Sequence, residues 1–352
     1  MKISPTIFVV PTGIGCEIGG FAGDALPAAK LLAAASGCLV THPNVMNGGS
    51  LSERDERIFY VEGYSLDRFA RGEIGLKKMN QQNLGIIFDS SIENELLLRN
   101  LQAADACIAT LGINISSYVI TDKPVGIVIK KESSGLSNGY VENPDTLINA
   151  GKKLINQGAT AIAIVTRFPD EIDIDNLNLY REGKGVDAIA GVEAVISHLI
   201  SKYLKLPCAH APALSPVELM SELDPRAAAE EIGYTFLPSV LIGLSTAPDL
   251  IDLPNLNDKV TIYPNEINTI VVPHGALGGD AVLACMERNI SIISVKNKGV
   301  LDVSKKWFDY KNFFSVENYL EAAGLLLSMR EGLNYKSVQR PLKSIKDFNF
   351  SN

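Results

Sequence analysis

The sequence predicts an α/β fold: a mostly parallel sheet with helices on both faces, a β-hairpin arm and a smaller second lobe or cap. Short apolar runs alternate with longer helix-like runs along most of the 352 residues, the order expected of a parallel sheet. Apolar residues make up 46% of the chain and charged residues 20%, so a large core can be buried. Residues 125–139 alternate and then turn at glycines, which predicts the hairpin.

The first half of the chain contains short apolar runs, each bounded by glycine, proline or polar residues, which are typical of buried strands. They lie at residues 7–10, 38–41, 58–62, 84–88 and 117–120. Helices are expected between them, at residues 25–36, 64–73 and 92–111. The last of these has leucines at helical spacing.

The second half continues the alternation. Asn143-Pro144-Asp145 is a helix start signal, and Gly158 closes that helix. The strongest strand prediction is the apolar run at residues 160–166. Further strands are predicted at residues 206–209 and 290–295, and further helices at 190–204, 225–233, up to 289, and 316–330. We expect a surface loop at residues 169–188, a proline-broken apolar piece at 236–243 and a polar excursion at 248–268.

The domain organisation predicted from this order is a single α/β unit over residues 1–335, because no low-complexity linker interrupts the chain. It could divide into two lobes, of about residues 1–130 with 265–335, and of residues 131–264. Residues 336–352 are polar and are expected to form a peripheral tail.

Two glycine-rich segments each join an apolar strand to a helix-like run. Residues 7–25 read IFVVPTGIGCEIGGFAGDA and residues 270–282 read IVVPHGALGGDAV. Backbone amides and a helix N-terminus in such a corner can hold an anion, although a plain turn is the alternative. The spacing fits neither a P-loop nor a dinucleotide fingerprint. In an open α/β sheet, both corners could line one crevice.

Polar residues follow most of the predicted strands, where the carboxyl ends of parallel strands gather ligand sites. They are Thr12, His42, Glu62, Asp89, Thr121 with Asp122, Arg167, His210 and His274. The pattern predicts a polar crevice, against the alternative that loop residues are simply polar.

Within this crevice we assign His42 and His274 to general acid–base catalysis, together with Asp122. Arg167 is expected either to clamp a carboxylate or phosphate, or to form a structural pair with Asp89 or Asp122. His198, inside a predicted helix, is interpreted as a packed or partly exposed residue. The residues assigned to substrate binding are Thr12, Gly13, Gly15, Gly19, Gly20, Asn44, Glu62, Arg167, His210, Gly275, Gly278 and Gly279. No metal ligand is assigned, and no cofactor is identified.

Composition excludes several classes of partner. The net charge is −8 and the 32 basic residues are dispersed, so no nucleic-acid footprint is present. No apolar run approaches the roughly 20 residues of a membrane span. The five cysteines are scattered and form no C-x-x-C pair, which is typical of reduced thiols. We expect a cytoplasmic protein, or a stromal one if this is a mature plastid form, which could assemble as a homo-oligomer.

Six motifs together carry a family resemblance: VPTGIGCEIGGFAGDALP, THPNVMNG, YVEGYSLDRFA, AGVEAVISHLI, PCAHAPAL and VVPHGALGGDAVL. They resemble an uncharacterised "domain of unknown function" family found in cyanobacteria and plant chloroplasts. The resemblance covers nearly the whole chain and implies a cytosolic or stromal location, but no activity.

Three functional hypotheses follow from the residues. The first is an enzyme, of isomerase, lyase or transferase class, acting on a small anionic metabolite held by the two glycine corners and Arg167. The second is a non-catalytic protein that binds such a metabolite or regulates a partner. The third is a metal-dependent hydrolase, for which the histidines and acids of the crevice would have to converge.

Overall fold

The larger sheet of the protein has six parallel strands in the order β14-β13-β12-β1-β2-β3. This arrangement comes from a computed structural model that describes residues 2–48, 54–131, 137–169, 174–232, 236–253 and 261–345. The strands are β1 (Thr6–Phe8), β2 (Leu39–Thr41), β3 (Ile58–Tyr60), β12 (Thr269–Pro273), β13 (Ser291–Val295) and β14 (Phe313–Val316).

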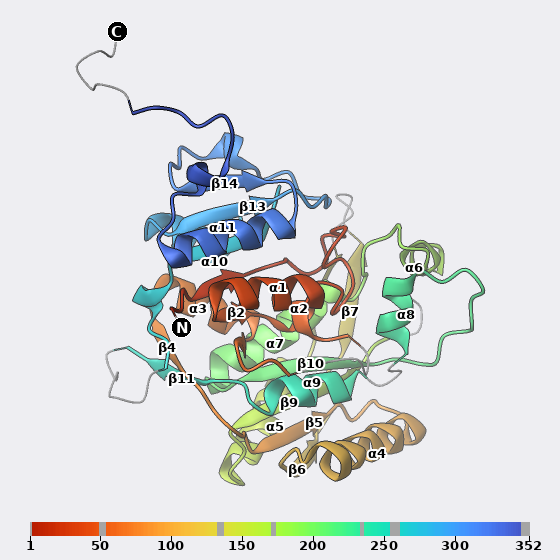
Figure 1. Cartoon of the computed structure of the whole chain (residues 1–352). Helices are drawn as coiled ribbons and strands as arrows, with labels where there is room; N and C mark the ends of the chain where they lie inside the picture. The colour runs from red at the N-terminus through yellow and green to blue at the C-terminus, as the bar shows by residue number, and fades with distance from the viewer. Residues whose placement is uncertain are drawn as a thin grey trace.

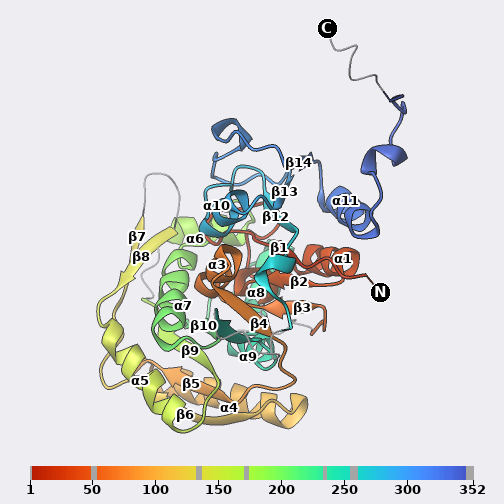
Figure 2. The same cartoon turned by 90° about the vertical axis from the view of Figure 1, so that its left-hand side faces the viewer.

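Helices cover both faces of this sheet, as Figure 2 shows with the sheet seen close to edge-on. On one face, α1 (Leu26–Ser36) packs against α11 (Tyr319–Glu331). On the other, α3 (Gly63–Arg71) packs against α10 (Asp280–Glu287). The sheet is therefore buried on both faces, which explains why its strands are short continuous apolar runs.

The strand order reverses in the middle of the larger sheet. The chain leaves β1 outward to β2 and β3, whereas it leaves β12 outward to β13 and β14 in the opposite direction. Right-handed crossovers then place α1 and α10 on opposite faces. A crevice is expected outside the carboxyl ends of the two adjacent strands at such a switch point.

The second sheet has four parallel strands in the order β10-β9-β5-β6. They are β5 (Leu84–Phe88), β6 (Ile115–Ile120), β9 (Ala161–Arg167) and β10 (Cys208–Ala213). One face is covered by α4 (Asn94–Leu111) and α9 (Leu237–Leu244), and the other by α5 (Pro144–Asn156) and α7 (Ala190–Leu204). Because α7 also contacts α3, it lies between the two sheets.

Smaller elements lie around the two parallel sheets and their helices. Two antiparallel pairs are present: β4 (Ile74–Lys77) with β11 (Asp249–Asp252), and β7 (Ile127–Lys131) with β8 (Ser137–Val141). The short helices are α2 (Pro43–Met46), α6 (Ile174–Arg181), α8 (Pro225–Glu231), η1 (Pro264–Glu266), η2 (Lys305–Trp307) and η3 (Tyr335–Val338). Among the residues that the structure describes, no helix has the length and apolar character needed to span a membrane.

Helices α6 and α8 form a small projection beside the body of the molecule (Figure 1). Aromatic and cationic contacts fasten it to the first glycine corner. The ring of Tyr180 stacks on that of Phe21 with 4.4 Å between centroids, and the guanidinium of Arg226 lies 4.5 Å from the same ring. The projection is therefore packed against the first glycine corner.

The core joins the two sheets. One hydrophobic cluster contains fully buried side chains of both, including Phe8 and Leu39 from the larger sheet and Phe88 and Val165 from the smaller one. A second cluster fills the space between the four-stranded sheet and helices α5 and α7, for example with Ile162 and Ile196. The two sheets thus share a continuous hydrophobic interior.

The predicted fold class is confirmed: the sheets are parallel, helices cover their faces, and the hairpin arm is β7–β8. The chain passes from the larger sheet to the smaller one between β3 and β5, and β4 lies in a separate antiparallel pair. Two details differ from the sequence prediction. The expected surface loop contains α6. The proline-broken piece is helix α9, because Pro238 lies in its first turn, where no backbone donor is needed.

Candidate functional site

A pocket of about 370 Å³ opens at the switch point of the six-stranded sheet. Its wall includes Pro11 and Thr12, which follow β1, and Ala276 and Gly279, which follow β12. Both glycine corners therefore line one crevice, as expected for the carboxyl ends of adjacent strands at a reversal. The rest of the wall includes residues of α2, α3, α7, α8, α9, α10 and β10 and of the loop before α7.

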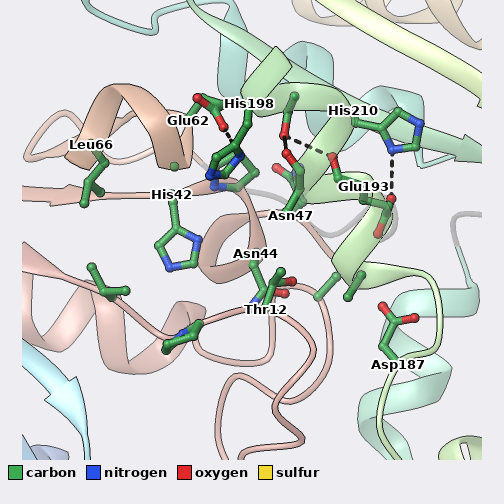
Figure 3. Close-up of a pocket in the computed structure, with 18 of the residues that line it drawn as sticks. Thr12, His42, Asn44, Asn47, Glu62, Leu66, Asp187, Glu193, His198 and His210 are labelled. Atoms are coloured by element: carbon green, nitrogen blue, oxygen red, sulfur yellow. Dashed lines mark hydrogen bonds and ion pairs between the residues drawn. The ribbon is translucent and has the colours of Figure 1, made fainter. Parts of the chain in front are cut away.

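Helix α7 contributes one complete face to the pocket. The lining residues Ala190, Glu193, Ala194, Ser197 and His198 recur at the three- and four-residue spacing that places side chains on one side of a helix. The small residues leave space, and the polar ones face the cavity. Figure 3 shows Glu193 and His198 on this helix, each beside a partner from another element.

The first of these partnerships is an ion pair between Glu62 and His198. One carboxylate oxygen of Glu62, the N-cap of α3, accepts from the amides of Tyr64 (2.9 Å) and Ser65 (3.3 Å). The other lies 2.8 Å from Nδ1 of His198. Burial opposes the charged imidazole, but the contact with Glu62 and its charge outweigh it, so the pKa of His198 is raised.

Gly63 makes room for this imidazole. A Cβ atom at Gly63 would lie 2.7 Å from Cε1 of His198, closer than side chains tolerate. The glycine after the capping glutamate therefore lets the ring approach the N-terminus of α3.

His42, unlike His198, favours its neutral form. The amide of Val10 donates to its Nε2 at 3.1 Å, which keeps that nitrogen unprotonated. Burial, together with the nearby charge of His198, lowers the pKa of His42 to about 4. The neighbouring Asn44 side chain donates to the carbonyls of Val10 (3.3 Å) and Gly19 (3.2 Å), fixing this corner. The pocket thus contains one imidazole held neutral and one that favours its charged form.

A second histidine–carboxylate pair joins β10 to α7. His210 Nδ1 lies 3.0 Å from a carboxylate oxygen of Glu193, and its Nε2 lies 2.7 Å from the hydroxyl of Thr166. Both ring nitrogens are therefore engaged within the protein. His210 is not at the end of a strand, as the sequence suggests, but in the middle of β10.

The pocket wall is rich in acids. Six of the described residues in this wall are carboxylates: Glu62, Asp67, Asp187, Glu193, Glu230 and Asp280. Burial is the main cause of raised pKa values here, to about 6 for Asp67 and about 7 for Asp187, and well above the usual range for Glu230. Among the described residues that line the pocket, none is lysine or arginine. The side-chain cation that an anionic ligand would meet in this wall is therefore His198 in its charged form.

Many backbone amides of the glycine corners donate hydrogen bonds to other groups of the protein. In the first corner, the amides of Glu17, Ile18 and Gly19 donate to the Lys298 carbonyl, Asn297 and Asp24. In the second, the amides of His274, Ala276 and Leu277 donate to backbone carbonyls. The glycines mainly permit tight backbone: Gly13, Gly15, Gly19 and Gly275 have positive φ, and a Cβ at Gly20 would meet the Cys16 carbonyl at 2.2 Å.

Three residues assigned from the sequence lie elsewhere. Arg167 does not line the pocket: its guanidinium contacts Glu93 (2.9 Å), Ser215 (3.0 Å) and the Phe168 carbonyl, and Glu93 is neither of the partners expected from the sequence. Asp122 is solvent-exposed and accepts from the Thr146 hydroxyl. His274 is exposed, with Nδ1 3.5 Å from the Ser294 hydroxyl.

The remaining assigned residues divide in the same way. Those that line the pocket are Thr12, His42, Asn44, Glu62, His210 and Gly279. Those that do not are Gly13, Gly15, Gly19, Gly20, Gly275 and Gly278.

The sequence reasoning missed His198, Glu193 and Asp187 as pocket residues. A signal for the first two was available: residues 190–198 place small and polar residues at helical spacing within an otherwise apolar helix. Asp187 gives no comparable signal, because it lies in the loop before α7. Among the described residues, no three histidine, cysteine, aspartate or glutamate side chains are arranged to hold a metal ion.

Comparisons with known proteins agree with the sequence resemblance. The model of the family described as "Protein of unknown function (DUF3326)" matches residues 5–339. An "Uncharacterized lipoprotein" of Synechococcus is 43% identical over 330 residues, covering 94% of this chain and 91% of the relative. No solved structure matches the chain.

Proposed function

Because the chain belongs to the DUF3326 family, whose description names no activity, we propose its function from the pocket: an enzyme that performs acid–base chemistry on a small polar metabolite. The observation that carries the proposal is that the two carboxylate oxygens of Glu62 contact different partners. One oxygen caps α3, which fixes the carboxylate, and the other holds Nδ1 of His198. A carboxylate that orients a histidine in a cavity is a recurrent arrangement for proton transfer.

In this proposal His198 exchanges a proton with the substrate through Nε2. Glu62 favours the imidazolium, so His198 begins as the acid. His42 is neutral, with its proton on Nδ1, and serves as a hydrogen-bond donor to a substrate oxygen. Asp187 has a pKa raised by burial to about 7, so it can accept or return a proton near neutral pH.

The reaction classes that fit are isomerisation and elimination, because each needs one group to add a proton and another to remove one. The acidic wall favours a substrate whose polar group is neutral or cationic. An anionic metabolite, expected from the glycine corners, is the second candidate. It would have to be held by backbone amides and by His198 in its charged form.

The test is a thermal-shift and turnover screen of neutral, cationic and anionic small metabolites. A ligand at 100 times its dissociation constant should add about 2.7 kcal/mol of apparent stability. We expect His198→Gln and Glu62→Gln to reduce turnover at least 100-fold, the usual contribution of a positioned acid or base. The matched control is His274→Gln, an exposed histidine outside the pocket, which should leave turnover unchanged.

A ligand that is turned over equally well by the His198→Gln variant would refute the catalytic assignment. Binding without turnover, lost in the same variants, would instead favour the non-catalytic metabolite-binding protein.

The location that we propose is the cytoplasm or the plastid stroma. The cysteines are free and buried, and burial raises the pKa of Cys16 to about 12. The Synechococcus relative is named a lipoprotein. Cys16 is buried in the first glycine corner, so a lipid on this residue would require the corner to open. Mass spectrometry of the protein from its native cells should find Cys16 unmodified, and a lipid on this residue would overturn the proposed location.

A further inference from the structure

A second cavity of about 270 Å³ adjoins the pocket on the side of helices α6 and α8. Its wall also includes the loop before α7 and the segment that follows β10. Four residues line both spaces: Asp187, Ile189, Glu230 and Phe236. We call this space the second chamber.

The polar groups in the wall of the second chamber are largely engaged with one another or with neighbours. The Tyr180 hydroxyl donates to Glu230 at 2.6 Å, and Glu231 pairs with Arg181 at 2.7 Å. The Ser215 hydroxyl accepts from Arg167 at 3.0 Å. What these pairs leave exposed to the chamber is mainly apolar, from Pro169, Leu177, Val186, Ala188, Ile189, Leu214, Pro216, Val217, Ala227 and Phe236.

We propose that the second chamber binds an apolar portion of the substrate whose polar group reacts at His198. This inference rests on the proposed function and narrows its substrate class to molecules with a polar, neutral or cationic head and an apolar tail or ring. The size is suitable, because a cavity of about 150 Å³ already accommodates benzene, and this chamber is about 270 Å³. Apolar walls with a few convergent polar groups are typical of small-molecule sites.

The shared residues explain how one molecule could occupy both spaces. Ile189 and Phe236 are apolar, and the two acids beside them, Asp187 and Glu230, have pKa values raised by burial. The junction therefore carries less charge near neutral pH than two ordinary carboxylates would, which lowers the cost of passing an apolar group between them. The stack of Tyr180 on Phe21 ties the wall of the chamber to the first glycine corner.

The experiment is a chain-length series of n-alkylamines, from ethylamine to octylamine, titrated into the protein by calorimetry at pH 7. The ammonium group suits the acidic pocket, and each methylene that enters the chamber should tighten binding roughly fourfold, until the chamber is full. The measurement needs no turnover, so it is independent of the catalytic assignment.

Two variants test the location of the tail. Ala227→Phe fills the chamber from α8, and Val217→Trp narrows it at a position where the side chain is 43% exposed, so folding should tolerate the change. In both variants the affinity for the alkylamines should rise much less with chain length, while the affinity for ethylamine should stay unchanged. The matched control, Ala106→Phe on the exposed side of α4, should keep the dependence.

Equal affinity for ethylamine and octylamine in the unmodified protein would overturn the inference and leave the proposed function standing. A chain-length dependence that survives in both chamber variants would also overturn it, because the tail would then bind elsewhere. Failure of the proposed function has a different signature: turnover that persists in His198→Gln.

Discussion

The two parallel sheets reverse their strand order in the same way but use the reversal differently. In the six-stranded sheet, β1 and β12 lie side by side and their following segments line the pocket. In the four-stranded sheet, β5 and β9 are the corresponding neighbours, and Asp89 follows β5. Its carboxylate accepts from the amides of Ser91 (3.1 Å), Val125 (3.0 Å) and Arg167 (3.3 Å) and is 2% exposed.

The comparison shows why a polar residue after a strand is ambiguous. At the smaller sheet, the acid at the reversal satisfies backbone amides, and nearby Arg167 is held by Glu93 and Ser215. At the larger sheet, histidines and acids face a cavity, and several have displaced pKa values. A buried polar group with its bonds complete serves the fold, whereas one that faces a cavity with a perturbed pKa is a functional candidate.

The largest predicted effect is on stability at the smaller sheet. Asp89→Ala removes the acceptor of three backbone amides, and we expect it to lower the free energy of unfolding by about 3 to 5 kcal/mol. Asp122→Ala, just after β6 of the same sheet, is the matched control, and because Asp122 is exposed we expect a much smaller cost. Urea denaturation measures both. Equal losses in the free energy of unfolding would mean that the amide contacts of Asp89 do not stabilise the reversal between β5 and β9.

Unlike Asp89, a buried acid of the pocket should lower the stability of the protein when it is ionised. The pKa of Asp187 is raised to about 7, so its contribution to stability is complete below pH 4 and is lost as pH rises towards 7. Asp187→Asn should therefore stabilise the protein by roughly 2 to 4 kcal/mol above pH 7 and by little at pH 4. Urea denaturation at pH 4.5 and 8 tests this, with Asp122→Asn as the control. A loss of stability at pH 8 would contradict it.

The third prediction concerns His42. Its pKa is lowered to about 4, so the unfolded chain takes up a proton between about pH 6.5 and 4 that the native state does not. The stability of the protein should fall by up to about 3 kcal/mol across that window through this group. His42→Asn should remove this part of the pH dependence, and His274→Asn should not. Thermal or urea unfolding at pH 4.5 and 7 compares them, and identical profiles for the two variants would argue against a buried neutral His42.

Much of the fold could be predicted from the sequence because buried parallel strands and their helices leave local signals. The sequence predicts the strand at residues 84–88 and the helix at residues 190–204 with the bounds that the structure has. The sequence does not predict α6. Its acidic, glycine-rich segment has weak hydrophobic periodicity, and the helix is held by tertiary contacts such as that of Arg181 with Glu231. In α9, the proline that suggests a break is tolerated because it lies in the first turn.

The candidate site was predicted only where its residues follow strands. His42 and Glu62 were found because a corner of the larger sheet positions them, and both line the pocket. The sequence does not predict His198 as a pocket residue. Its place in the pocket depends on α7 lying between the two sheets, and this packing leaves no local signal in the sequence. The sequence leaves Arg167 between a ligand contact and a structural pair, because its partner Glu93 becomes its neighbour only when β9 pairs with β5.

We propose that Glu62 holds His198 as the proton-transfer group of the pocket. The most direct test is an NMR titration of the imidazole signals in the unmodified protein and in Glu62→Gln. We predict that the pKa of His198 lies above its ordinary value in the unmodified protein and falls in the variant, because the neighbouring charge is gone while burial remains. A His198 pKa that is the same in both proteins would contradict the account.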